Sequence, residues 1–215
     1  MSGHNREGIT PAKRDHAKEA MFGNATQGAD AYLDRFTDVD LDRIQELTGK
    51  KISALLVDID ACTARPYGPI LEENIAHFRK LLDDGVKIGV NSNCKSTERL
   101  QPLIDMKIPI YDGEISKPEK PSFINACKMI DSDPTETFMV GDNPNTDGGA
   151  IGVLGGMIFL KAIPEKWSEV WAFAEKSPIK KITKTVSVLA QKLTRAIAIK
   201  RTLKLNPTII RSFDI

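Results

Sequence analysis

Short apolar runs alternate with amphipathic stretches along the middle of the chain. The first run, Ile52-Ser53-Ala54-Leu55-Leu56-Val57, is bounded by polar residues and predicts a buried strand. In the stretch that follows, residues 70–82, apolar side chains recur at helical spacing, and Asp84-Gly85 marks the end of a helix. The pattern therefore predicts a strand followed by a helix.

The same alternation repeats toward the C-terminus. Predicted strands cover residues 87–90, 108–111, 137–140 and 157–160, and predicted helices cover residues 97–103, 121–130 and 146–154. A short helix is predicted at residues 41–47, before the first strand. Strands and helices joined by such short connections imply right-handed crossovers and a mostly parallel sheet covered on both faces. The predicted fold class is α/β, a three-layer sandwich.

The two ends of the chain have a different pattern. Residues 1–38 are rich in Gly, Asn, Ala and charge without periodicity, which predicts a flexible extension or a surface wrap. Residues 39–164 form the predicted core, and residues 165–215 form a predicted helical, basic extension. Within it, a helix is expected at 167–174 and an amphipathic helix at 179–199. On the second helix Ile179, Ile182, Val186, Leu189, Leu193 and Ile197 share one face, opposite Lys181, Lys184, Lys192 and Arg195.

Composition narrows the class of protein. The 215 residues are 41% apolar and 27% charged, as in soluble globular proteins. No run reaches the roughly 18 apolar residues of a membrane span. The first residues lead into no hydrophobic signal region, so the predicted location is cytoplasmic. Cys62, Cys94 and Cys127 are too few for a disulfide framework and are expected to be reduced thiols.

Charge is distributed unevenly along the chain. Residues 176–211 hold ten basic residues and no acid, whereas residues 1–175 hold 20 basic and 28 acidic residues. The cationic helix 179–199 could lie on anionic phospholipid and place the protein at the inner membrane surface. Alternatively, its apolar face packs on the sheet or on a partner while its lysines stay in solvent. A nucleic-acid or ribosome contact is a third interpretation, although no interleaved aromatic residues indicate base stacking.

Asp58 and Asp60 follow the first predicted strand directly. Two residues apart, they could supply one carboxylate for in-line attack on phosphorus and another for proton transfer to the leaving oxygen. This pairing predicts an aspartyl-phosphate intermediate. The alternative interpretation of an Asp-X-Asp pair is a solvated turn or a helix cap.

Three further polar motifs stand at positions that suit the same chemistry. Ser92 follows its own strand and could hold a phosphate oxygen, and Lys117 could neutralise the nucleophile and the phosphoryl group. Asp142 and Asp147 would complete an all-oxygen Mg²⁺ site with Asp58. The alternatives are a surface lysine at 117 and, at 147, a first-turn acid favoured by the helix dipole.

Together, Val57-Asp58-Ile59-Asp60, Val90-Asn91-Ser92-Asn93, Ser116-Lys117-Pro118 and Val140-Gly141-Asp142 with Asp147 resemble the motifs of the haloacid dehalogenase superfamily of Mg²⁺-dependent phosphohydrolases. The resemblance implies Asp58 as nucleophile and Asp60 as general acid and base, its carbonyl also facing the ion. It implies that Ser92 and Asn93 bind phosphate and that Lys117 stabilises charge. Asp142 and Asp147 would bind the metal.

Residues from about 36 to 200 are more closely similar to the subfamily IIIA phosphatases, which include phosphatidylglycerophosphate phosphatases. The cues are the Ser92-Asn93 and Lys117-Pro118 pairs, the glycines that follow Asp147, and the basic tail. Two positions depart from the superfamily pattern. Cys62 stands where Thr is usual, four residues after the nucleophile, and Ala61 replaces Asn or Gly. The thiol of Cys62 raises the question of sensitivity to oxidation.

The spacing between motifs bears on the substrate. Asp60 and Ser92 are 32 residues apart, and Ser92 and Lys117 are 25 apart, which leaves no room for an inserted cap domain. An uncapped site favours a phosphate displayed on a lipid, a protein or a nucleic-acid end, and phosphatidylglycerophosphate is the best single candidate. The alternative function is a non-catalytic module of the same fold that contacts membrane, ribosome or protein through its basic helix.

Overall fold

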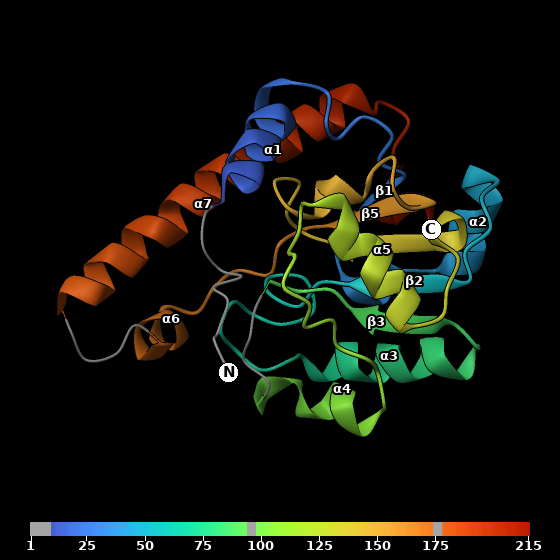
Figure 1. The fold of residues 1–215 in the computed structure, drawn as a ribbon, viewed down its shortest axis with the longest axis horizontal. Helices are drawn as coiled ribbons and strands as arrows, with labels where there is room; N and C mark the ends of the chain where they lie inside the picture. Colours follow the sequence, from blue (N-terminus) through green and yellow to red (C-terminus); the bar gives the residue numbers. More distant parts are fainter. Residues whose placement is uncertain (1–9, 94–97, 174–177) are drawn as a thin grey trace.

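A computed structural model of the chain describes residues 10–93, 98–173 and 178–215. Within them, one sheet has the strand order β3-β2-β4-β5-β1-β6, and every pairing is parallel (Figure 1). The α/β class with a parallel sheet is confirmed. The strands are β1 Ala31–Leu33, β2 Ala54–Val57, β3 Lys87–Val90, β4 Thr137–Gly141, β5 Gly156–Leu160 and β6 Ile210–Arg211.

Helices cover both faces of this sheet. One apolar cluster joins Leu55 and Val57 of β2 to buried residues of α2 and α3. A second joins Ala54 and Leu56 of the same strand to Phe123 on α5. Because alternate residues of a strand point to opposite faces, the two clusters lie on the two faces of the sheet, each between the sheet and a layer of helices. The fold is therefore a three-layer sandwich. The helices are α1 Pro11–Phe22, α2 Leu41–Thr48, α3 Glu72–Asp83, α4 Gln101–Asp105, α5 Lys120–Met129, α6 Trp167–Phe173 and α7 Pro178–Leu205.

The N-terminal segment belongs to the fold, so the prediction of a flexible extension at 1–38 is wrong for the part that is described. Strand β1 lies between β5 and β6, and α1 packs along α7. The Asp30 carboxylate accepts a hydrogen bond from Met157 N at 3.0 Å and pairs with Lys50 at 2.6 Å. The three-residue run Ala31-Tyr32-Leu33 is too short to show a periodic pattern. It forms a strand because it pairs with the strands on both sides of it.

The C-terminal segment also joins the sheet. Strand β6, within the predicted helical extension 165–215, pairs with β1 at the edge. The Asn206 amide, just beyond α7, donates to Thr26 O at 2.8 Å and accepts from Gly28 N at 2.7 Å. Hydrogen bonds of Asn206 therefore join the C-terminal segment to the N-terminal segment around residues 26–28.

Two predicted elements of the core are shorter than expected. Residues 108–111 make only an isolated bridge between Val90 and Ile110, since Pro109 has no N–H to donate to a ladder. Instead of a helix at 146–154 there is a 3₁₀ turn, Asp147–Ala150, in a segment whose several glycines disfavour a helix. The first residue of the predicted helix 97–103 lies outside the described residues.

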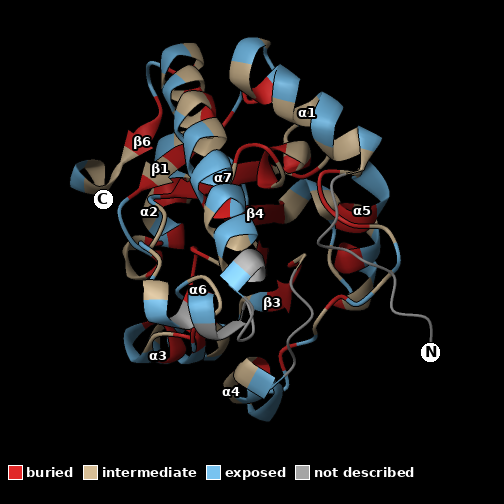
Figure 2. Cartoon of the chain, turned by 90° about the vertical axis from the view of Figure 1, so that its left-hand side faces the viewer, coloured by how far each residue is buried: buried red, intermediate tan, exposed pale blue. Residues whose placement is uncertain are grey.

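Helix α7 turns its predicted apolar face to solvent. Val188, Ala198 and Thr202 are buried, whereas the apolar stripe is exposed (Figure 2). The interpretation that this apolar face packs on the sheet is therefore wrong for the stripe. In the part of the chain that the structure describes, no helix has the length and hydropathy needed to cross a membrane. The exposed stripe consists of Ile182 (66%), Val186 (61%), Leu189 (52%) and Leu193 (64%).

Candidate active site

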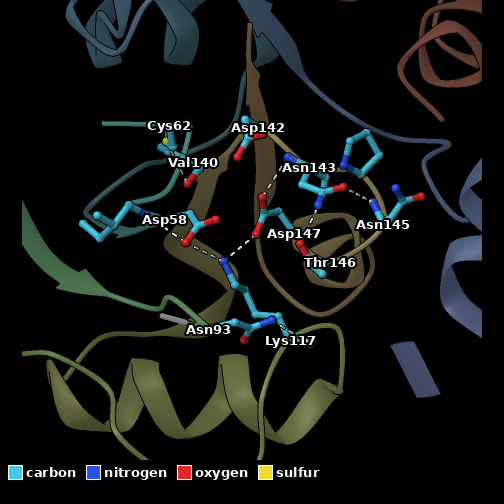
Figure 3. A network of polar contacts seen from close by, with 12 residues as sticks. Asp58, Cys62, Asn93, Lys117, Val140, Asp142, Asn143, Asn145, Thr146 and Asp147 are labelled. Carbon is cyan, nitrogen blue, oxygen red and sulfur yellow. Dashed lines mark hydrogen bonds and ion pairs between the residues drawn. The ribbon is translucent and has the colours of Figure 1, made fainter. Parts of the chain in front are cut away.

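Asp58 and Asp142 follow adjacent strands at one edge of the sheet. Val57 of β2 is in register with Val140 of β4, and Asp58 N donates to Val140 O at 2.9 Å. Asp147 begins the 3₁₀ turn after β4. The carboxylates of Asp58, Asp142 and Asp147 are buried, and one oxygen from each lies within 4.8 Å of the other two (Figure 3).

The position of Asp147 depends on Gly141 and Asn143. Asn143 N donates to Asp147 Oδ2 at 3.0 Å, and Asp147 N donates to Asn143 O at 2.8 Å. A Cβ atom on Gly141 would lie 2.3 Å from Asp147 Oδ2. Glycine at 141 therefore allows the carboxylate to approach the end of β4.

Lys117 lies within the carboxylate cluster, not on the surface. Its ammonium nitrogen is 3.1 Å from Asp58 Oδ1 and 2.5 Å from Asp147 Oδ1, and its side chain is 1% exposed (Figure 3). Burial lowers the pKa of Lys117, but the attraction of Asp147 and Asp58 outweighs it and raises the pKa overall. The Asn93 side-chain amide donates to Lys117 O at 3.2 Å and so connects two loops of the site.

The cluster contains more negative charge than its cations balance. Burial raises the pKa of both Asp142 and Asp147, against the opposing effects of Arg195 and Lys117. Three carboxylates in contact with two cations leave one excess negative charge. An all-oxygen set of this kind is what a hard divalent cation prefers, so the residues present fit a Mg²⁺-like ion.

Asp60 and Ser92 lie at the same edge but outside this cluster. The Asp60 carboxylate, 30% exposed, accepts from Tyr67 N at 3.1 Å and pairs with Arg99 at 2.7 Å. Ser92 is buried beyond β3, where Asn91 N donates to Val57 O at 3.0 Å. The structure thus brings all the predicted residues to one edge of the sheet, while their individual roles stay predictions.

Two arginines of the site were not predicted. Arg99 holds Asp60, and Arg195 of α7 donates to Asp142 Oδ2. The Arg195 side chain is only 20% exposed, although the sequence placed it on the polar face of a helix. No spacing signal could connect Arg195 to an acid 53 residues earlier in the chain.

Cys62 and Ala61, which depart from the motif pattern, both lie in environments that the structure defines. Cys62 is buried with its Sγ 3.8 Å from Val140 O, and burial raises the pKa of its thiol well above the ordinary value. Ala61 has a φ of 61°, in the left-handed region that glycine and asparagine tolerate best. This backbone conformation explains why Asn or Gly suits position 61.

No curated protein matches the chain. A putative HAD family hydrolase from Streptomyces avermitilis is 16% identical with a TM-score of 0.44, covering 52% of this chain and 68% of its own. The cobalt-bound deoxy-D-mannose-octulosonate 8-phosphate phosphatase from Haemophilus influenzae is 18% identical with a TM-score of 0.42, covering 50% and 67%. A family model described as haloacid dehalogenase-like hydrolase matches residues 3–155, most of the chain. The chain therefore belongs to the haloacid dehalogenase-like hydrolase family.

Proposed function

We propose that this hydrolase is a Mg²⁺-dependent phosphomonoesterase that works through an aspartyl-phosphate on Asp58. The observation that carries the proposal is the buried cluster of Asp58, Asp142 and Asp147 around Lys117. Burying three carboxylates costs free energy unless cations balance their charge. Groups with pKa values shifted in this way are typical of functional sites.

The contacts of Asp58 suit a nucleophile. Its Oδ1 accepts from Ile59 N at 2.8 Å and faces Lys117 at 3.1 Å, while no described residue donates to Oδ2. Oδ2 would attack phosphorus in line, forming the Asp58 oxygen to phosphorus bond as the ester bond to the leaving group breaks. Lys117 would counter the negative charge that develops on the phosphoryl group.

Asp60 would transfer the protons of both half-reactions. In the first, its protonated carboxyl gives a proton to the departing oxygen. In the second, Asp60 takes a proton from water as the water oxygen attacks phosphorus, and the bond from phosphorus to Asp58 breaks to release phosphate. Because Tyr67 N and Arg99 both act on Asp60 Oδ1, Oδ2 is the oxygen that would carry the proton.

The other predicted residues would hold the ion and the phosphate. Asp58, Asp142 and Asp147 would bind Mg²⁺ together with the Asp60 carbonyl, and the bound ion would neutralise phosphoryl oxygens. Ser92 would hydrogen-bond the phosphate. The Asn93 amide nitrogen already donates to Lys117 O, so its contribution would be to hold Lys117 in place.

The substrate is proposed to be a phosphate displayed on an anionic membrane, with phosphatidylglycerophosphate as the specific candidate. Support comes from the exposed apolar stripe of α7, Ile182, Val186, Leu189 and Leu193, which has the exposed Lys200 and Lys204 beside it. An outward apolar face with cationic neighbours is typical of helices that lie in the interface of anionic bilayers. The protein would then work at the inner membrane surface.

Phosphate release tests the reaction and its substrate. We expect Mg²⁺-dependent release from an aryl phosphate, loss of release after chelation, and a preference for phosphatidylglycerophosphate in vesicles. Equal, negligible rates on every substrate would contradict the enzymatic proposal and favour the non-catalytic binding module.

Vesicle binding tests the apolar stripe separately. The native protein should co-sediment with vesicles that contain phosphatidylglycerol and not with neutral phosphatidylcholine vesicles. The double variant Leu189→Gln/Leu193→Gln should lose this binding and keep its hydrolysis of soluble aryl phosphate. Unchanged vesicle binding by the double variant would contradict the membrane assignment. A concentration-dependent dimer that the two substitutions abolish would also contradict it, because the stripe would then be a contact between two copies of the chain.

A further inference from the structure

Helix α7 lies beside the candidate active site and contacts residues of it. In Figure 2 it runs in front of β4, and contacts of its side chains reach two sides of the site. Arg195 donates to Asp142, and Lys184 lies 4.3 Å from the centre of the Tyr67 ring. Tyr67 N in turn donates to Asp60. A segment outside the family match at 3–155 therefore borders both the carboxylate cluster and Asp60.

The inward face of α7 carries basic residues beside the buried Val188, Ala198 and Thr202. Lys181, Lys184 and Arg195 are partly buried on this face, while the apolar stripe faces away from the protein. Lys192 pairs with Glu165 at 2.5 Å, which fixes the helix beside the site. Lys184 and Arg195 thus bring the positive charge of α7 next to Tyr67 and Asp142.

Arg195 adds a positive charge that the four motifs do not require. With a divalent cation bound, the three carboxylates and Lys117 would be electrically neutral, and Arg195 makes the total one positive charge. A guanidinium has five N–H donors in a planar fork, and the hydrogen bond of Arg195 to Asp142 uses only Nη1. The remaining donors suit a second anion, because a guanidinium binds carboxylate and phosphate groups through paired hydrogen bonds.

We propose that Arg195 forms a second anion-binding subsite, and that the leaving group of the substrate carries its own negative charge. Lys184, about 16 Å away along the same face of α7, adds positive charge beside Tyr67. The charged group is a carboxylate or a phosphodiester. This inference rests on the proposed phosphohydrolase function. The inference adds that α7 selects among phosphomonoester substrates by the charge of their leaving group.

Binding of matched ligands tests the subsite without turnover. Calorimetry on the Asp58→Asn protein in Mg²⁺ would compare 3-phosphoglycerate with glycerol 3-phosphate, which differ by a carboxylate in place of a hydroxymethyl group. Deacylated phosphatidylglycerophosphate provides the phosphodiester arm. The tighter arm identifies the anionic group, and because no hydrolysis is needed, the result does not depend on activity.

The variants separate Arg195 from the general charge of α7. Arg195→Gln should reduce the preference for the anionic ligand by about tenfold or more, as expected for loss of a charge-assisted hydrogen bond. Arg195→Lys should retain part of the preference, and Lys200→Gln, an exposed lysine five residues along α7, should retain all of it. In the active protein, Arg195→Gln should raise KM for the anionic substrate more than it lowers kcat.

Two results would overturn the proposal. One is equal affinity of the Asp58→Asn protein for the anionic ligands and for glycerol 3-phosphate. The other is a preference that survives unchanged in Arg195→Gln. If the anion preference is present and depends on Arg195 but no substrate is hydrolysed, the subsite stands and the proposed reaction fails.

Discussion

The Lys117 ammonium group lies between Asp58 and Asp147, 3.1 Å from one carboxylate and 2.5 Å from the other, in an environment closed to solvent. A lysine so deeply buried remains charged only because two acids surround it. The same pairing holds the Asp58 carboxylate in one orientation. Lys117 thus connects the stability of the site to its proposed chemistry.

Replacing Lys117 by Met should impair both properties. We expect kcat to fall by at least about 100-fold, the usual effect of losing a group that stabilises transition-state charge. In metal-free buffer the variant should lose about 3 to 5 kcal/mol of unfolding free energy, because its partners stay buried without a counter-charge. Urea unfolding and phosphate release measure the two effects. Lys120→Met, at an exposed lysine nearby, is the control, and a native kcat for Lys117→Met would refute the assignment.

The buried carboxyls predict an unusual dependence of stability on pH. The pKa values of Asp142 and Asp147 are raised by burial in the folded protein from an ordinary value of 3.8. Above about pH 4 the folded state therefore binds more protons than the unfolded state. This proton binding stabilises the folded protein, and the stabilisation is lost as pH rises through the folded pKa values. A tenfold difference in proton affinity between the folded and unfolded states corresponds to about 1.4 kcal/mol of stability.

Comparison with Asp142→Asn isolates this contribution from the rest of the protein. In the presence of a chelator, the unfolding free energy of the native protein should decrease relative to that of the variant between about pH 4 and 8. Mg²⁺ should restore the native protein at the upper end of this range. A native protein that gains stability relative to the variant as pH rises would contradict the assignment.

Cys62 should be unreactive in the folded protein despite lying next to the proposed nucleophile. Its side chain is buried, and burial raises the pKa of the thiol well above its ordinary value, so little reactive thiolate forms near neutral pH. Iodoacetamide at about pH 7.5 should leave the Cys62 peptide unmodified until urea unfolds the chain. Rapid alkylation of the native protein at Cys62, read by peptide mass spectrometry, is the opposite outcome.

Ala61→Gly should stabilise the protein. An L-residue in the left-handed region costs about 1 kcal/mol that glycine does not incur, which corresponds to about 2 to 4 °C in Tm for a chain of this size. The control Ala196→Gly lies at an exposed position within α7, where glycine should lower Tm. Differential scanning calorimetry would show whether the two substitutions have the expected opposite signs.

The candidate site was largely predictable because its residues follow strands that apolar runs reveal. Val57 and Val140 end two buried runs, and the acids that follow them in a parallel sheet must meet at one edge. Strand β1 was not predictable, because three apolar residues carry no periodic signal and pair only through the partners beside them.

The orientation of α7 was also beyond the pattern. Periodicity shows that Ile182 and Leu193 share a face, but it does not show which face turns toward the protein. In the folded protein α7 makes long-range contacts, of Arg195 with Asp142 and of Lys192 with Glu165, while the apolar stripe is left in solvent. Contacts between distant segments of this kind have no local sequence signal.

The most direct test of the central claim is phosphate release from an aryl phosphate by the native chain and by Asp58→Asn, each with Mg²⁺ and with chelator. The account predicts Mg²⁺-dependent turnover by the native protein and loss of at least about 1000-fold in the variant, whose amide cannot form the acyl phosphate. Turnover by Asp58→Asn at the native rate, or no turnover by either protein, would contradict it.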